Sequence, residues 1–284
     1  MDQAANLRRL VLDGETEPKK TKTIAIASGK GGVGKTSLAV NLSLALAKNK
    51  FKVTLLDADL GMANINVLLG VIPKYNLYHV IQGQKRLRDI FIEVPGGVKI
   101  IAGASGFYQL ANLDAWQRDD FIGQISEIKT DDYVIIDTGA GVGHNVLNFV
   151  MAADEVLIIT TPEPTAITDA YGIIKSIAVQ SQEKVIRLIV NRVESSSEGD
   201  KVAGRIISIA HQFLNIKVEN LGYIFDDMAV YKAVKNQKPF WLSHPKAKAS
   251  NCISTIAGKI VSQDLKAQGG MGLGSFFKKL FVNE

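Results

Sequence analysis

The stretch SGKGGVGKTS at residues 28–37 constrains this chain more than any other. It fits G-x-x-x-x-G-K-[ST], a loop whose backbone N–H groups surround phosphate oxygens, with the next helix pointing its N-terminus at the same anion. An apolar run at 23–27 precedes it and a run rich in helix formers at 38–47 follows it, which predicts strand, loop and helix. Lys35 is expected at the β- and γ-phosphates of a nucleotide, and the Thr36 hydroxyl at Mg²⁺. The predicted nucleotide-binding residues of the loop are Gly31, Gly32, Val33, Gly34, Lys35, Thr36 and Ser37.

Two apolar runs end in aspartate, as strands of a parallel sheet do at a ligand site. Asp57 ends FKVTLLD and Asp137 ends DYVIID. Because ligands bind at the carboxyl ends of strands in open α/β sheets, both carboxylates are expected beside the phosphate-binding loop. The second run matches the pattern whose aspartate holds Mg²⁺ through water, so Asp137 is a predicted metal-site residue. The amide of Gly139 or Gly141, just beyond it, is predicted to sense the terminal phosphate.

The composition limits the kinds of protein that this chain can be. The chain has 284 residues, of which 46% are hydrophobic and 21% charged, which fits one α/β domain with a sizeable core. Its single cysteine, Cys252, excludes an intramolecular disulfide framework and a multi-cysteine metal site. The start lacks the features of a signal peptide and no apolar run approaches ~18 residues, so we expect a cytoplasmic protein. The net charge of +5 mildly favours anionic partners such as nucleotide, lipid or DNA.

Alternating strand-like and helix-like segments predict the fold class. They indicate a P-loop NTPase-like α/β domain at residues 23–265, a mostly parallel sheet with helices on both faces. The loop at 161–170 leads into a helix, and Thr165 is its predicted N-cap, because a threonine hydroxyl can accept a hydrogen bond from the first amides of a helix. Further strands are predicted at 98–103, 155–160, 185–190 and 221–224, and further helices at 113–129 and 245–265.

The two ends of the chain lie outside this domain. Residues 1–12 are predicted to form a short amphipathic helix, and 13–22 a polar linker. Residues 266–272 form a glycine-containing linker, and 273–284 a second amphipathic helix with two lysines off its apolar face. Each helix either docks on its own domain or waits for a partner, which for the C-terminal helix is an anionic membrane surface. The predicted membrane residues are Leu273, Phe276, Phe277, Lys278, Lys279, Leu280 and Phe281.

The heptad KGGVGKT at residues 30–36 resembles the signature of the MinD/ParA superfamily, which are ATPases with a deviant Walker A motif. In that family the first lysine, here Lys30, reaches across a dimer interface to the nucleotide of the other subunit. The resemblance implies a homodimer that forms with ATP and hydrolyses it slowly to ADP and phosphate. Lys30 and Lys35 are then both catalytic residues.

A second stretch carries the same resemblance. DADLGMAN, which begins at Asp57, is similar to the family's switch I, D-x-D-x-G-x-x-N. The match implies that Asp59 orients or activates the attacking water and that Asp57 supports the hydrated Mg²⁺. The family resemblance also implies that Asn191, which follows the predicted strand at 185–190, contacts the adenine, with Arg192 next to it. Residues 225–228 occupy the place of a family loop that packs beside the base.

The N-terminal stretch DQAANLR at residues 2–8 looks like the D-Q-A-x-x-L-R motif of FlhG proteins, also called YlxH or FleN. These are MinD-like ATPases that set flagellum number and placement. The resemblance implies that the N-terminus stimulates an FlhF-type GTPase, that components of the flagellar C-ring are partners, and that the protein associates peripherally with the inner face of the cell membrane. The partner-binding residues would be Asp2, Gln3, Ala4, Leu7 and Arg8.

Three alternatives stay open at this point. A MinD protein that regulates the cell-division site shares the core motifs, and the N-terminal stretch disfavours it. A ParA-type partition ATPase would bind DNA through basic residues; the net charge permits this, but the Phe-rich tail makes DNA an unlikely partner. An adaptor that binds nucleotide and barely hydrolyses it is disfavoured by the presence of both Asp59 and Asp137.

Overall fold

A computed structural model of the protein describes residues 21–59, 64–103, 113, 115–127, 131–264 and 270–282. The predicted N-terminal helix and nearly all of the linker that follows it lie outside the described residues, as do residues 60–63 of the switch I stretch. The predictions for Asp2, Gln3, Ala4, Leu7 and Arg8 therefore concern a part of the chain on which the structure carries no description.

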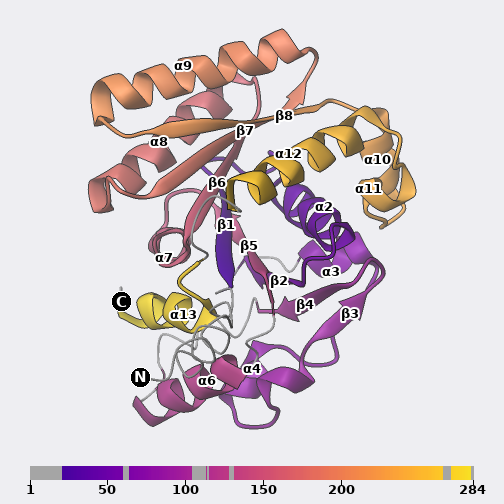
Figure 1. Ribbon diagram of the computed structural model, residues 1–284, viewed down its shortest axis with the longest axis vertical. Coiled ribbons are helices and arrows are strands. Elements are labelled where there is room, and N and C mark those ends of the chain that lie inside the picture. Colours follow the sequence, from indigo (N-terminus) through magenta and orange to yellow (C-terminus); the bar gives the residue numbers. More distant parts are fainter. Residues whose placement is uncertain are drawn as a thin grey trace, which may run out of the picture.

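The described residues form one eight-stranded sheet in the order β3-β4-β2-β5-β1-β6-β7-β8. Neighbouring strands run parallel except β3, which pairs antiparallel with β4 at one edge. The predicted mostly parallel α/β architecture is confirmed (Figure 1). The strands are β1 (Lys22–Ser28), β2 (Val53–Ala58), β3 (Ile92–Val94), β4 (Val98–Ala102), β5 (Tyr133–Ala140), β6 (Glu155–Thr160), β7 (Val185–Val193) and β8 (Val218–Phe225).

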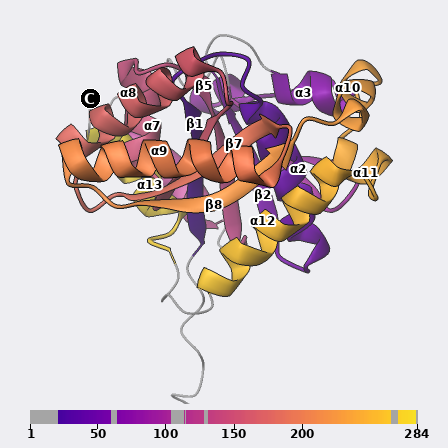
Figure 2. The same ribbon diagram turned by 90° about the horizontal axis from the view of Figure 1, so that it is seen from above.

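Helices cover both faces of this sheet, which explains why its central strands are apolar without alternation. In β1, Ile24 and Ile26 belong to one core layer, while Ala25 and Ala27 belong to the layer on the opposite face. Both layers exclude water, so each strand needs apolar residues at every position. The two groups of helices flank the sheet in the view from above (Figure 2).

The first group packs with Ile24 and Ile26: α2 (Lys35–Lys48), α3 (Asn64–Leu69), α10 (Met228–Lys235), α11 (Phe240–Ser243) and α12 (Lys248–Asp264). The second group packs with Ala25 and Ala27: α4 (Leu77–Ile81), α6 (Ala115–Glu127), α7 (His144–Ala152), α8 (Pro164–Gln180), α9 (Ser196–Leu214) and α13 (Leu273–Val282). A short 3₁₀ helix, η1 (Leu87–Asp89), adds Leu87 to the second layer.

The start of α8 corrects one prediction. Thr165 is not the N-cap: α8 begins at Pro164, and Glu163 occupies the cap position with no side-chain cap hydrogen bond. Proline supplies the start because its fixed φ suits the first helical turn and its missing N–H needs no partner there. The Thr165 hydroxyl is instead bonded to Lys30.

A cluster of charged side chains lies at the amino end of the sheet, opposite the phosphate-binding loop. The Lys22 ammonium pairs with Glu155 at 2.8 Å and with Asp264, the last residue of α12. Arg187 of β7 also pairs with Glu155, and the Tyr133 hydroxyl donates to Asp264 at 2.9 Å. The charges compensate one another, which is what makes their burial tolerable. The cluster ties the first strand of the domain to its last core helix.

The C-terminal helix α13 is docked on the domain between α6 and α7 (Figure 1). Phe276 and Phe277 are 1% and 3% exposed, and Leu280 and Phe281 are also buried. The Phe277 ring meets Phe121 of α6 edge-on at 5.1 Å between ring centroids. The apolar face predicted from the sequence is therefore confirmed, and in this conformation it contacts protein. Within the described part of the chain, no helix is both long and apolar enough to cross a membrane.

Candidate nucleotide-binding site

Three neighbouring strands bring the sequence-predicted site residues together. β5 lies between β2 and β1, so the carboxyl ends of all three meet at one edge. Asp57 of β2 and Asp137 of β5 are register partners directly opposite each other. The phosphate-binding loop follows β1 and leads into α2, which begins at Lys35. The predicted strand, loop and helix around the motif are confirmed.

Lys35 is held inside this edge rather than in solvent. It is 8% exposed, and its ammonium donates to the Ser28 hydroxyl at 3.0 Å. Burial lowers the pKa of Lys35, while the negative charges of Asp137 and Asp59 act in the opposite direction. A lysine oriented in this way presents its charge to an anion in the loop.

The two strand-end carboxylates are buried, and Lys35 compensates their charge only in part. Asp57 is fully buried and Asp137 is 1% exposed. Burial raises the pKa of each to about 7; the charge of Asp137 adds to the effect on Asp57, while Thr36 and Lys35 moderate it for Asp137. Among the described side chains, Asp57 Oδ2 and Asp137 Oδ1 are buried oxygens with no hydrogen-bond partner. Such oxygens suit a hydrated divalent cation, which would supply the missing donors and charge.

The residues just beyond Asp57 and Asp137 lie close to each other and to the phosphate-binding loop. A side chain at Gly139 would place its Cβ 3.7 Å from Asp59 Oδ1, so Asp59 lies close to the carboxyl end of β5. The Gly141 amide donates to the Ser28 carbonyl at 2.8 Å. Of the two amides predicted to sense the terminal phosphate, that of Gly141 is thus already engaged within the protein.

Lys30 lies on the surface of the loop, away from Lys35. Its ammonium bonds the Glu163 carboxylate at 2.8 Å and the Thr165 hydroxyl at 2.9 Å. The Lys30 and Glu163 side chains are 38% and 56% exposed. The ion pair lowers the pKa of Glu163. Lys30 is therefore held within its own subunit by an exposed contact, which is weak and easily exchanged for another anion.

Sequence reasoning missed Glu163 and Thr165 as partners of Lys30. They lie more than 130 positions from it along the chain. The available signal was the Pro162-Glu163-Pro164-Thr165 loop at the carboxyl end of β6, the strand next to β1. Only the strand order places that loop beside the phosphate-binding loop.

Asn191 and Arg192, at the end of β7, also contact the phosphate-binding loop. The Asn191 side-chain amide donates to the Val33 carbonyl at 2.8 Å, and the Arg192 guanidinium donates to the Gly32 carbonyl at 2.9 Å. Gly34 has a φ of +104°, and a Cβ there would lie 2.5 Å from Asn191 Nδ2. The loop therefore requires glycine at that position, both for its backbone conformation and for this close approach.

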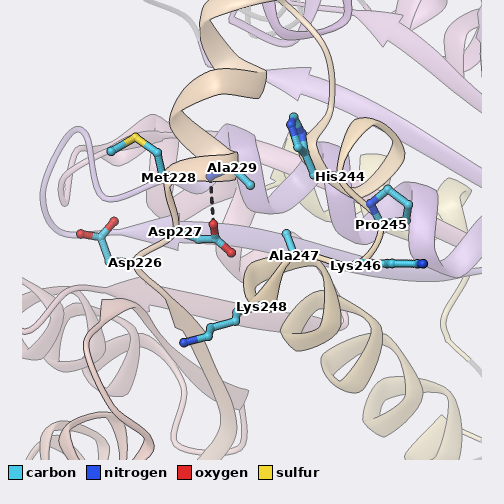
Figure 3. Close-up of a pocket in the computed structure, with 9 residues that line it drawn as sticks. All are labelled: Asp226, Asp227, Met228, Ala229, His244, Pro245, Lys246, Ala247 and Lys248. Atoms are coloured by element: carbon cyan, nitrogen blue, oxygen red, sulfur yellow. Dashed lines mark hydrogen bonds between the residues drawn. The ribbon is translucent and has the colours of Figure 1, made fainter.

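An open cavity of about 670 Å³ adjoins the ends of β7 and β8 (Figure 3). One wall is the loop that follows β8, in which Asp227 accepts from the Ala229 amide at 2.9 Å and so caps α10. The other wall is the turn between α11 and α12. The lining residues are Asp226, Asp227, Met228, Ala229, His244, Pro245, Lys246, Ala247 and Lys248.

Comparisons with known proteins agree with this geometry. Residues 24–240 match the CobQ/CobB/MinD/ParA nucleotide binding domain. The chain is 40% identical over 230 residues to the antiactivator FleN of Pseudomonas aeruginosa, covering 81% of this chain and 82% of FleN. It is 37% identical over 238 residues to the flagellum site-determining protein YlxH of Helicobacter pylori, covering 81% and 79%. The septum site-determining protein MinD of Pyrococcus horikoshii, solved with Mg-ADP, superposes with a TM-score of 0.69 at 25% identity, covering 87% of this chain and 99% of that one.

The fold and the site define a P-loop nucleotide-binding protein with a mostly parallel sheet and a second lysine in its loop. The chain belongs to the MinD/ParA family of ATPases, and within it to the FlhG group that includes FleN and YlxH.

The raised pKa values of Asp57 and Asp137 predict how stability changes with pH. A carboxyl whose folded pKa exceeds its unfolded value stabilises the fold at low pH, and that contribution is lost as pH rises through the folded pKa. Without nucleotide or Mg²⁺, we expect each of the two carboxyls to lower the free energy of unfolding by on the order of 2–3 kcal/mol between pH 5 and pH 8. Asp57→Asn should reduce this fall and be more stable than the unsubstituted protein at pH 8. Urea denaturation at both pH values measures it.

The matched control is Asp119→Asn, which changes an exposed carboxylate of α6. It should leave the pH dependence unchanged. If Asp57→Asn and Asp119→Asn both follow the unsubstituted protein, the buried carboxylates do not carry the proposed cost.

Proposed function

We propose that this protein is an ATP-dependent molecular switch that dimerises with ATP, binds the cell membrane and regulates flagellum number and placement. The observation that carries the nucleotide chemistry is the pair of buried, unpartnered carboxylate oxygens behind a complete phosphate-binding loop. The similarity to FleN and YlxH over most of the chain supports the flagellar role.

The residues present fit ATP with Mg²⁺. Thr36 and Asp137, already hydrogen-bonded to each other, would hold the ion together with Asp57, and the ion would neutralise charge on the phosphates during transfer. Lys35 would pair with the β- and γ-phosphates, while the loop amides from Gly31 to Ser37 surround them. Asp59 would orient the attacking water from the edge of the same cluster.

The base would lie at the ends of β7 and β8. Asn191 and Arg192 project from β7 onto the phosphate-binding loop, next to where the phosphates bind. The loop at 225–228 would flank the base, and the open cavity beyond it leaves room for the ribose or base to settle (Figure 3). This placement keeps the phosphates at the loop and the base at the neighbouring strand ends, as open α/β sheets do.

Dimerisation with ATP would transfer Lys30 from Glu163 to the nucleotide of the second subunit. The exposed pair with Glu163 is worth little, so a phosphate can displace it at small cost. Completion of each site by the other subunit would make hydrolysis slow in the monomer and dependent on the dimer. ADP, which lacks the terminal phosphate, would favour return of Lys30 to Glu163.

Membrane binding would use α13 after it leaves its groove. The apolar side chains that would enter lipid are the ones now packed on α6 and α7. Removing each of them from water contributes roughly 1.5–3 kcal/mol, whether it is buried against protein or in lipid. The exchange from groove to lipid is thus close to balanced for one helix. Two helices on one dimer add an avidity of ~10²–10⁴, which would make membrane residence depend on ATP.

The flagellar role would be carried out through partners. An FlhF-type GTPase would be stimulated by the N-terminal segment, which lies outside the described residues, and components of the flagellar C-ring would bind the ATPase domain. A MinD-like role at the division site is the second candidate, since the solved MinD of Pyrococcus horikoshii has the same fold. The higher identities to FleN and YlxH favour the flagellar role.

Lys30→Met tests the dimer. The substitution removes an exposed ion pair, so we expect a stability change below about 1 kcal/mol and unchanged binding of Mg-ATP. Sedimentation velocity with a non-hydrolysable ATP analogue and Mg²⁺ should show a dimer for the unsubstituted protein and a monomer for Lys30→Met. Lys175→Met, an exposed lysine of α8, is the matched control and should dimerise normally. A Lys30→Met dimer of unchanged affinity would contradict the proposal.

Lys278→Glu tests the membrane contact without disturbing the docked helix. Lys278 is exposed on α13, off its buried face. A lysine near an anionic surface contributes about 1 kcal/mol, so reversing its charge should weaken binding roughly tenfold or more. The measurement is co-sedimentation with vesicles of anionic lipid and the ATP analogue, with Lys175→Glu as control. Equal pelleting of Lys278→Glu and the control would count against α13 as the membrane-binding element.

A further inference from the structure

Thr21 and the first residue of β1, Lys22, contact the chain on the two sides of the C-terminal linker. The Thr21 carbonyl accepts from the Gly272 amide at 3.1 Å, directly before α13 begins. The Lys22 ammonium pairs with Asp264, the last residue of α12. Thr21 and Lys22 thus contact residues at the two ends of the segment that connects α12 with α13. Thr23 acts on that segment through Asp154.

Asp154 completes this contact. One of its carboxylate oxygens accepts from the Thr23 amide and the Thr23 hydroxyl, each at 2.8 Å. The other accepts from the Met271 amide at 3.1 Å. The carboxylate therefore bridges β1 and the linker, at the turn between α7 and β6 where the chain passes beside α13.

Gly270 shows how closely the linker lies against the strand. A Cβ at this position would lie 2.5 Å from the Thr21 carbonyl oxygen, 2.6 Å from Asp154 Oδ2 and 2.6 Å from the Lys22 Cα. The Thr21 carbonyl oxygen and the Lys22 Cα are backbone atoms at the start of β1, so they cannot move aside. Only glycine permits the linker to sit here.

We infer that Thr21 and Asp154, the latter held by Thr23, form a clasp on residues 270–272 that must open before α13 can leave its groove. The inference rests on the proposed membrane function, because it says what restrains the helix that would bind lipid. The clasp is separate from the apolar groove. Its contacts are polar hydrogen bonds from the Met271 and Gly272 amides, and they lie just before the start of α13.

Two hydrogen bonds can decide whether α13 is docked or free, because the apolar contribution is nearly equal in the groove and in lipid. Apolar burial favours the groove and lipid about equally, so it decides little between them. Two linker hydrogen bonds, from Met271 and Gly272, exist only in the docked state, and each changes the docked-to-free ratio about fivefold. The clasp therefore sets how often α13 is free when no lipid or partner is present.

Gly270→Ala opens the clasp without touching the nucleotide site, the groove or the apolar face of α13. In full-length protein without lipid, we expect amide hydrogen exchange across residues 273–282 to become at least tenfold faster. Gly258→Ala on α12 is the control, since a Cβ there has no neighbour within 4 Å. Met271→Pro, which removes one donor to Asp154, is a second variant and should act in the same direction. Unchanged exchange in both Gly270→Ala and Met271→Pro would overturn the clasp.

A vesicle measurement separates this inference from the proposed function. With anionic vesicles and ADP, Gly270→Ala should pellet several-fold more than the unsubstituted protein, because its helix is released without ATP. Faster exchange with no pelleting in any nucleotide state would leave the clasp standing and overturn membrane binding by α13. Unchanged exchange with ATP-dependent pelleting would do the reverse.

Discussion

Two buried carboxylates beside a buried lysine are the constraint on which this structure depends. Asp57 and Asp137 face each other on adjacent strands, and Lys35 enters the same space from the start of α2. The apolar layers on both sides of the sheet keep water out, which raises the pKa values of the two acids. Among the described residues, one oxygen of each acid has no hydrogen-bond partner. The cost of that arrangement is removed when a cation and phosphates occupy the edge, so nucleotide and fold stabilise each other.

The local sequence was enough to predict the nucleotide site at the carboxyl ends of β1, β2 and β5. The run of β1, the loop at 28–37 and the helix after it are consecutive, and the carboxyl-end rule placed Asp57 and Asp137 beside them before the strand order was known. The sequence did not predict that Glu163 and Thr165 hold Lys30, because that contact depends on β6 lying next to β1. Thr165 was wrongly predicted as an N-cap because the proline before it starts the helix instead. Asp154 gave no local signal, since its partners are a strand start and a linker far away in sequence.

Among the described residues, Lys30 and α13 have proposed intermolecular roles, and both are engaged within the subunit. Lys30 is paired with Glu163, and the apolar face of α13 is packed on α6 and α7. The periodicity of the tail correctly predicted which face is apolar, but periodicity is the same whether a helix packs on protein or on lipid. Thr21 and Gly272 are hydrogen-bonded, so the first described residue of the chain lies beside the start of the C-terminal helix.

The most direct test of the account is a count of the protons exchanged when preformed Mg-ATP binds. Calorimetric titrations at pH 7 in two buffers of different ionisation enthalpy give that number. With both carboxyl pKa values near 7 in the free protein, binding should ionise them and release roughly one proton per site, and the release should fall toward zero by about pH 8.5. Asp57→Asn should release fewer protons than the unsubstituted protein at pH 7. Binding of Mg-ATP with no proton release at pH 7, or with equal release by Asp57→Asn, would contradict the claim that buried carboxylates await the cation.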